Sequence, residues 1–163
     1  MKLKNILILI VLVVVIVFGI WWVTTATQRK IANLLEETAA LASNSVLDSD
    51  EQKIEKSQDL IANFSETGVI DWQENGAIPN GELFGREEIY QKVLAVKNSI
   101  SYQIDLSDIR VEILPGKKSA MASFNLVVTQ RQNVLAWQAK TQLARNGKVW
   151  QISNLTLEPV LKK

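Results

Sequence analysis

The chain has 163 residues, of which 47% are hydrophobic, with 18 Lys and Arg against 17 Asp and Glu. It contains no His and no Cys, which excludes Cys/His zinc sites, thiol nucleophiles, Ser–His–Asp triads and disulfides. Its formal net charge of +1 gives no bulk attraction to nucleic acid, so we expect no nucleic-acid partner.

An uncharged apolar run extends from Ile6 to Val23. A helix rising about 1.5 Å per residue would make this run roughly 27 Å long, close to the ~30 Å hydrocarbon core of a bilayer. Trp21 and Trp22, at its C-terminal edge, suit the headgroup region. The alternatives are a cleaved signal peptide, whose apolar region is usually shorter, and a buried core helix. We predict an uncleaved N-terminal transmembrane helix, with residues 1–26 as the anchor.

The basic residues around this run predict its orientation. Lys2 and Lys4 precede it closely, whereas Arg29 and Lys30 follow at some distance. The positive-inside rule then favours a cytoplasmic N-terminus and a C-terminal domain outside the cytoplasm, in the periplasm or at the cell surface.

Helical spacing of apolar residues predicts a juxtamembrane helix over residues 28–43, within a segment (27–50) that joins the anchor to the fold. Ser49 and Gln52 have the spacing of a capping box, which predicts a second helix running to about Glu66 and ending at Gly68. A short strand over residues 69–73, a loop over 74–81 and a third helix from residue 86 follow.

After residue 98 the apolar period changes from helical to alternating, which predicts four strands. The alternation changes faces near Ser107, where we expect a bulge or bend, and it changes faces again near Ser153. Asn146-Gly147 predicts a two-residue hairpin turn. Helices followed by antiparallel strands indicate the α+β class, with helices packed on a strongly curved antiparallel sheet. This cone-like domain is expected over residues 51–159, with a tail at 160–163.

Three segments carry a family resemblance: Leu60 to Asp71, Phe84 to Ile89 and Arg145 to Ile152. They read LIANFSETGVID, FGREEI and RNGKVWQI. In order and spacing they resemble the nuclear transport factor 2-like (SnoaL-like) family, from about Ala32 to Leu157. The resemblance implies a cone-shaped domain. It also implies either cyclase, isomerase or dehydratase chemistry in the cone, or binding alone.

By this resemblance, the strand over residues 69–73 is the one that holds the general-base carboxylate of the isomerases. Here the corresponding position is Trp72, with Asp71 beside it on the opposite strand face, and the catalytic His of several family enzymes has no counterpart. We therefore expect no catalytic residue, with Asp71 as the carboxylate to consider, and no metal or cofactor.

Aromatic residues fall on the strand faces that are expected to point inward. They would either line a pocket for an apolar ligand or lipid, or fill the cone as core. These candidate pocket residues are Trp72, Tyr102, Phe124, Trp137 and Trp150.

Charge is unevenly distributed along the chain. From Thr24 to Glu112 there are 16 acidic and 8 basic residues, whereas from Ile113 to Lys163 there are 8 basic and 1 acidic. Arg131 and Lys140 are therefore candidates for binding an acidic partner through the sheet face, unless the two charges only balance each other within the domain. The family resemblance also implies a homodimer that pairs sheets face to face.

The first functional hypothesis is a membrane-tethered, non-catalytic interaction domain of an envelope assembly. Exported domains of the resembled family occur behind a single span in secretion-channel scaffolds and lipid-transport-associated proteins, which makes this an analogy. The second is an isomerase-like enzyme with Asp71 as base and Tyr102 as oxyanion donor. The third is a lipid-binding domain whose cone mouth faces the bilayer.

Overall fold

The structure is a computed structural model that describes residues 25–75 and 78–160. The expected anchor, Ile6 to Val23, lies outside the described residues. Within the described ranges, none of the helices combines the length and the apolar character needed to cross a membrane.

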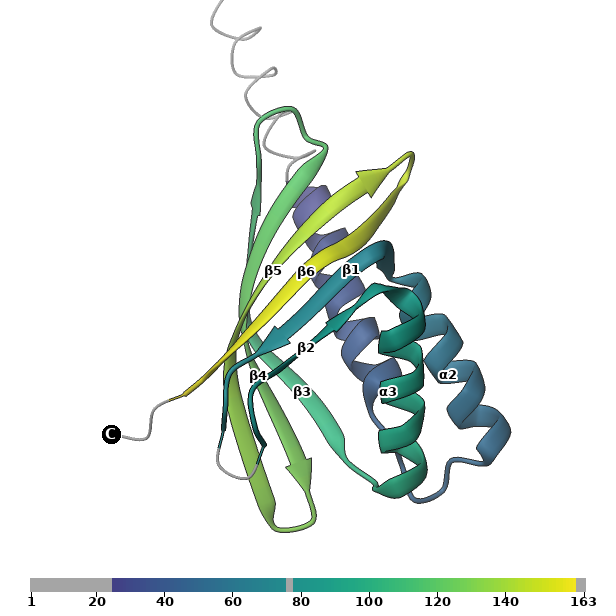
Figure 1. Cartoon of the computed structure of the whole chain (residues 1–163). Coiled ribbons are helices and arrows are strands. Elements are labelled where there is room, and N and C mark those ends of the chain that lie inside the picture. Colours follow the sequence, from purple (N-terminus) through teal and green to yellow (C-terminus); the bar gives the residue numbers. More distant parts are fainter. Residues whose placement is uncertain (1–24, 76–77, 161–163) are drawn as a thin grey trace, which may run out of the picture.

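The helical segments of the described residues lie on one face of a curved sheet (Figure 1). Residues 25–42 are helical and bury Ile31, Leu35 and Ala39 in the core. These residues recur every four positions, so one stripe of the helix faces the sheet. The segment expected as a juxtamembrane helix is therefore packed into the domain.

The capping box at the start of α2 (Asp50–Ala62) is confirmed. The Ser49 hydroxyl accepts from the Gln52 backbone N–H at 3.2 Å, and the Gln52 side-chain oxygen accepts from the Ser49 backbone N–H at 2.9 Å. Each side chain satisfies an N–H group that the helix leaves without a partner, which fixes where α2 begins.

The expected end of this helix was wrong. The helix stops at Ala62, and the next residues form β1 (Phe64–Trp72), so that Gly68 lies inside a strand. The Phe64 carbonyl accepts two hydrogen bonds from the Arg86 guanidinium, at 2.8 and 2.6 Å, and Phe64 pairs with Ile152. These contacts with distant parts of the chain override the local helical pattern.

The sheet has six strands in the order β2-β1-β6-β5-β4-β3. The meander of four strands expected after residue 98 is confirmed as β3 (Gln103–Ile113), β4 (Ser119–Gln130), β5 (Asn133–Asn146) and β6 (Val149–Pro159). β2 (Gly81–Phe84) was not expected, and it begins at the last residue of the expected loop. The expected antiparallel sheet was wrong, because β1 pairs with β6 in parallel and the sheet is therefore mixed.

Both expected changes of face coincide with a bulge. The β3–β4 register shifts between Ser107 and Arg110, where Asp108 has a φ of 55°. On β6, Ile152 pairs with Leu143 and Asn154 with Gln142, which leaves Ser153 as the extra residue. Bulges of this kind increase strand bending and twist, which fits the way the sheet curves toward the helices (Figure 1).

The turn between β5 and β6 differs by one residue from the expected Asn-Gly turn. The loop residues are Gly147 and Lys148, because Asn146 pairs with Val149. Gly147 has a φ of 62°, and glycine is the residue that tolerates this value at the first position of a two-residue turn.

The core lies between the sheet and the helices. Alternate residues of β4 and β5 point toward it, as their sequence pattern predicts. These buried residues are Ala120, Ala122, Phe124, Leu126, Trp137, Ala139, Thr141 and Leu143. α3 (Gly85–Ser99) closes the same space and buries Ile89 and Lys97.

Candidate functional site

An apolar cavity of about 300 Å³ lies between the inner face of the sheet and the helices. Ala42 lines it from the first helix, Ile70 and Trp72 from β1, Val93 from α3 and Leu126 from β4. A volume of this size is at the lower end of the pockets that hold small molecules.

Four of the five candidate pocket residues meet at this cavity. Trp72, Tyr102, Phe124 and Trp137 all line it, although they come from four different strands or strand ends. Trp150 is buried but does not line the cavity; it belongs to the hydrophobic core. Phe124 and Trp137 belong to the same core cluster and also line the cavity, so core and pocket share aromatic residues on the inward strand faces.

The cavity wall has few polar groups. The Trp72 indole N–H donates to the Pro79 carbonyl at 2.8 Å, whereas the buried Trp137 indole N–H has no partner among the described residues. Among the described residues that line the cavity, Tyr102 carries the one ionisable side chain. Burial raises the pKa of Tyr102 to about 12, so this phenol stays protonated and neutral at physiological pH.

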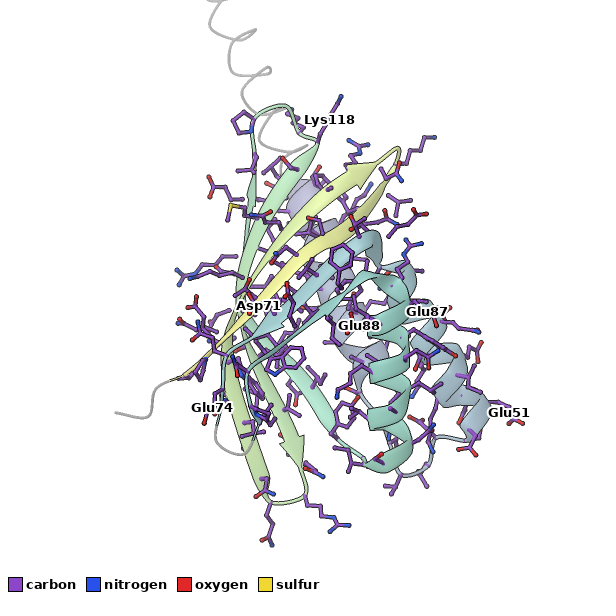
Figure 2. All side chains as sticks on the ribbon, in the orientation of Figure 1. Glu51, Asp71, Glu74, Glu87, Glu88 and Lys118 are labelled. Carbon is purple, nitrogen blue, oxygen red and sulfur yellow. The ribbon has the colours of Figure 1, made fainter. Side chains whose placement is uncertain are left out.

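Asp71 faces away from the cavity. Its neighbours Ile70 and Trp72 both line the cavity, and side chains alternate between the two faces of a strand. Asp71 pairs instead with Glu82 and Thr156 across the sheet, on the side away from the helices (Figure 2). The geometry therefore does not bring the proposed base, Asp71, to the same space as the Tyr102 phenol.

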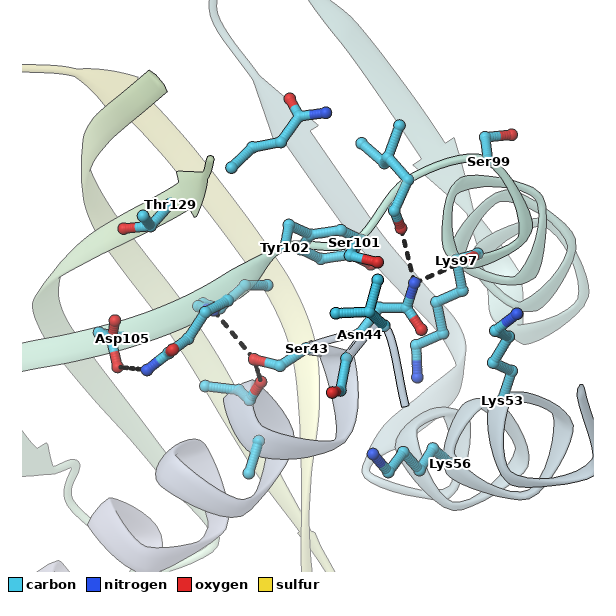
Figure 3. A pocket seen from close by; sticks show the side chains of 18 of the residues that line it. Ser43, Asn44, Lys53, Lys56, Lys97, Ser99, Ser101, Tyr102, Asp105 and Thr129 are labelled. Carbon is cyan, nitrogen blue, oxygen red and sulfur yellow. Dashed lines mark hydrogen bonds between the residues drawn. The ribbon is translucent and has the colours of Figure 1, made fainter. Parts of the chain in front are cut away.

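A second, more polar depression adjoins the cavity, and we call it the groove. It is lined by the last turns of the first helix and α3, and by the start of β3. Ala39, Tyr102, Ile104 and Leu106 line both the cavity and the groove. Tyr102 lies between Thr129 and Asp105 on one side and Lys97, Lys53 and Lys56 on the other (Figure 3).

Asn44 and Lys97 tie two helix ends together in this groove. The Asn44 side-chain amide donates to the Lys97 and Ile100 carbonyls, at 2.8 and 2.6 Å. In return, the Lys97 ammonium donates to the Leu41 carbonyl at 2.5 Å. Each side chain satisfies carbonyls that the end of a helix leaves without partners.

Lys97 is the largest fully buried side chain among the described residues, with 1% of its surface exposed. Burial, and then the nearby Lys56 ammonium, lower the pKa of Lys97 to about 8. Lys56 is itself paired with Asp48 at 2.8 Å, and this hydrogen bond lowers the pKa of the Asp48 carboxyl. The Asp48 carboxylate is bonded to Lys56 and acts on Lys97 only through space, whereas the hydrogen bond of the Lys97 ammonium goes to the Leu41 carbonyl.

Neither Asn44 nor Lys97 was a candidate from the sequence. Asn44 sits in a Ser-Asn-Ser run that indicates only a helix break. Lys97 follows Ile89 and Val93 at a spacing of four, so the apolar stripe of α3 already contained the signal that this lysine faces inward.

The two candidate partner-binding residues lie in different places. Arg131 is in the turn between β4 and β5 and lines the groove. Lys140 lies midway along β5, where its ammonium is 3.3 Å from the Glu158 carboxylate. The strand between them extends about 3.3 Å per residue, which separates them by roughly 20 Å or more, so they do not form one patch.

No protein-family model and no curated protein matches the chain. Several solved structures are similar in fold. A Mycobacterium tuberculosis protein of unknown function has a TM-score of 0.67 at 15% identity, over 89% of this chain and 76% of that one. An NTF2-like protein with a cystatin-like fold from Novosphingobium aromaticivorans has a TM-score of 0.65 at 13% identity, over 86% and 87%.

A third structure, from the same Novosphingobium species, is named as a candidate scytalone dehydratase. Its TM-score is 0.63 at 14% identity, over 85% of this chain and 87% of that one. At such identities the likeness concerns the fold and does not transfer an activity. These structures show that the described part of the chain has the nuclear transport factor 2-like fold, an α+β cone with helices packed on a curved sheet.

Proposed function

We propose that this chain is a membrane-tethered, non-catalytic domain that binds an apolar ligand in the cone cavity. The observation that carries this proposal is the lining of the cavity, which consists of aliphatic and aromatic side chains apart from Thr38 and the Tyr102 phenol. Apolar walls with a few polar groups are typical of small-molecule sites.

The same geometry favours binding over the isomerase-like alternative. Trp72 stands where the family resemblance places a general base, and its indole lines the cavity. Asp71 is on the other face of β1, beside Glu82. A general base must come within hydrogen-bond reach of the proton that it removes, and Asp71 does not line the space in which a substrate would bind.

We also propose that the segment from Ile6 to Val23 is the tether. The helix over residues 25–42 follows it directly in sequence and lines the cavity through Leu35, Thr38, Ala39 and Ala42. A span ending near residue 23 would keep the whole domain at the membrane surface, and the exported orientation would hold it outside the cytoplasm. The cavity-lining positions Leu35 to Ala42 lie about 15–26 Å along the helix from residue 25, so apolar molecules would reach the cavity after leaving the lipid phase.

A protein partner or second copy on the sheet face is the competing proposal. It has less support, because the charge of Lys140 is already compensated by Glu158. A new exposed ion pair between Lys140 and a partner would also contribute little binding free energy. Arg131 lies at the groove and not on that face. We therefore favour the cavity as the functional surface.

The proposal can be tested with the full chain in phosphatidylcholine nanodiscs and a photoreactive dodecanol that carries a diazirine at the end of its chain. After irradiation, peptide mass spectrometry locates the label. We expect label on peptides that line the cavity, especially those containing Leu126 and Trp137. Label confined to residues 1–26 would contradict the proposal.

Two variants make this test specific. Ala42→Phe places a ring on a cavity-lining position, and we expect it to reduce cavity labelling about tenfold. Ala95→Phe is the matched control, because Ala95 is exposed on α3 and lines neither space. Equal labelling of the two variants would show that the label does not report the cavity.

A further inference from the structure

We propose that the ligand is a fatty carboxylate, with its chain in the cone cavity and its carboxylate in the groove beside Lys97. This inference rests on the proposed function, because it assumes that the cavity binds a ligand. It adds the class of that ligand and the residues that select it.

The first support is that the two spaces adjoin. Ala39, Tyr102, Ile104 and Leu106 line both of them, so a molecule that fills the cavity can extend past these side chains into the groove. The Tyr102 phenol stands at this boundary and makes no hydrogen bond to the described residues. Its position suits the point at which an apolar chain ends and a polar headgroup begins.

The second support is the charge of the groove. Six charged side chains line the groove. The four basic ones are Lys53, Lys56, Lys97 and Arg131, and the two acidic ones are Glu36 and Asp105. Lys53 and Lys56 pair with Asp50 and Asp48, which do not line the groove. The six lining side chains sum to +2, and Asp48 and Asp50 bring the sum over this region to zero. Lys97 and Arg131 are the two lining cations that form no ion pair within the described residues, so these two side chains, and not the total charge, would favour an anionic headgroup over a cationic one.

The third support is Lys97 itself. Its ammonium has three donors, and one of them reaches the Leu41 carbonyl. Within the described part of the chain no carboxylate forms an ion pair with it. The Asp48 carboxylate acts on Lys97 through space but is bonded to Lys56. A buried cation without a directly bonded counter-ion is costly, and a ligand carboxylate would supply one.

Lys97 also has a purely structural explanation. Its bond to Leu41 satisfies a carbonyl at the C-terminus of the first helix, where a positive charge is favourable. That role predicts an effect on stability but no preference among ligands. The experiment must therefore measure selectivity and not folding alone.

The test compares photoreactive dodecanoate with the photoreactive dodecanol used above, again on the full chain in phosphatidylcholine nanodiscs. The two probes partition differently into lipid. For each probe, the readout is therefore the cavity labelling of a variant divided by that of the wild type, because the partitioning of the probe cancels in this ratio. We expect Lys97→Met to reduce cavity labelling by dodecanoate about tenfold, as for the loss of one charge-assisted hydrogen bond. Labelling by dodecanol should stay unchanged.

Arg131→Gln is a second variant, because Arg131 is exposed in a turn and its replacement should not affect folding. It should lower dodecanoate labelling by a smaller factor. Dodecyltrimethylammonium with the same photoreactive group provides a measurement on the unmodified chain, in case Lys97→Met does not fold. This cation should label the cavity less than either other probe, relative to its labelling of residues 1–26.

The outcomes separate the two proposals. If no probe labels the cavity, the proposed function itself fails. If all three label it and neither variant changes the ratio of dodecanoate to dodecanol, the cavity binds apolar chains and the fatty-carboxylate inference is overturned. Loss of labelling by both probes in Lys97→Met, in a folded protein, would also overturn it and assign Lys97 to the structural role.

Discussion

The Trp72 indole forms part of the cavity wall. It packs against Gly81 on the neighbouring strand, which holds the ring in this position. The two residues are paired across β1 and β2, and a Cβ at Gly81 would come within 2.8 Å of the Trp72 Cε2 atom. Glycine is therefore needed at this position for close packing of the indole. The same indole is fixed by its hydrogen bond to Pro79.

Gly81→Ala is expected to displace the Trp72 ring and to lower the free energy of unfolding by about 1–3 kcal/mol, as for other overpacked sites. Urea unfolding of the full chain in nanodiscs, followed by tryptophan fluorescence, measures this change. Asn80→Ala is the neighbouring control, because Asn80 is exposed and should stay within about 0.5 kcal/mol of the wild type. Equal stability of both variants would show that the ring moves without cost.

The lowered pKa of Lys97 makes the free energy of unfolding depend on pH. The unfolded chain keeps this proton up to about pH 10.5, whereas the folded chain releases it near pH 8. Between these values the unfolded state binds more protons, so the lysine contributes stability that rises with pH. The charged groups around Lys97 are Lys56, Lys53 and Asp48. Tyr102 acts in the opposite direction above about pH 10, because the folded state keeps its proton to about pH 12.

We expect the free energy of unfolding of the wild type, relative to Lys97→Met, to rise from pH 8 to pH 10. The slope should be at most about 1.4 kcal/mol per pH unit, which is the limit for one proton. Urea unfolding at pH 7, 8, 9 and 10 measures it, and the comparison with Lys97→Met cancels the titration of the other groups. A difference that is constant with pH would show that Lys97 titrates alike in both states.

At the level of whole elements, the sequence predicted those helix ends and strands that depend on residues close together in the chain. The capping box at Ser49, the four-strand meander and the changes of face near Ser107 and Ser153 all follow from the spacing of nearby residues, and all are present. The strand boundary at Phe64 and the parallel pairing of β1 with β6 depend on partners that are distant in sequence, so local spacing contained no signal for them.

The candidate site follows the same division. Inward-facing aromatic residues could be recognised from strand alternation, and four of them line the cavity. That Trp150 packs in the core, and that Asn44 and Lys97 meet across 53 residues of sequence, are consequences of how the elements pack. A lysine on an apolar stripe was the one available sign of the groove.

Arg86 holds α3 against the start of β1, because its guanidinium donates two hydrogen bonds to the Phe64 carbonyl. We expect Arg86→Met to lower the free energy of unfolding by about 2–3 kcal/mol, since hydrogen bonds from charged donors contribute more than neutral ones. Arg86→Lys should recover only part of this loss, because an ammonium cannot reproduce the two-pronged geometry.

Urea unfolding again provides the measurement, with Arg110→Met as the control, because Arg110 is exposed on β3. If Arg86→Met and Arg110→Met were equally stable, the contact with Phe64 would not determine the strand boundary. Hydrogen exchange at residues 64–68 would then show whether β1 still begins at Phe64.

For the molecule as a whole, the cavity and the proposed tether support each other. The helix that lines the cavity follows the apolar segment directly in sequence, at residues 25–42. A cavity tethered about 15–26 Å along the helix from residue 25 stays near a source of apolar ligands, whereas the same cavity in a freely diffusing domain would need ligands that dissolve in water. The orientation of the chain then decides which leaflet and which compartment supply the ligand.

The absence of cysteine from the chain allows that orientation to be measured without background. Gln132→Cys introduces a thiol in the exposed turn between β4 and β5, and Lys2→Cys introduces one before the apolar segment. With an exported domain, a membrane-impermeant maleimide should label Gln132→Cys in intact cells, or after the outer envelope alone is opened. Lys2→Cys should react only after the inner membrane is disrupted, because the positive-inside rule places it in the cytoplasm. The reverse pattern would place the cavity in the cytoplasm. Labelling of both thiols in the soluble fraction would remove the tether.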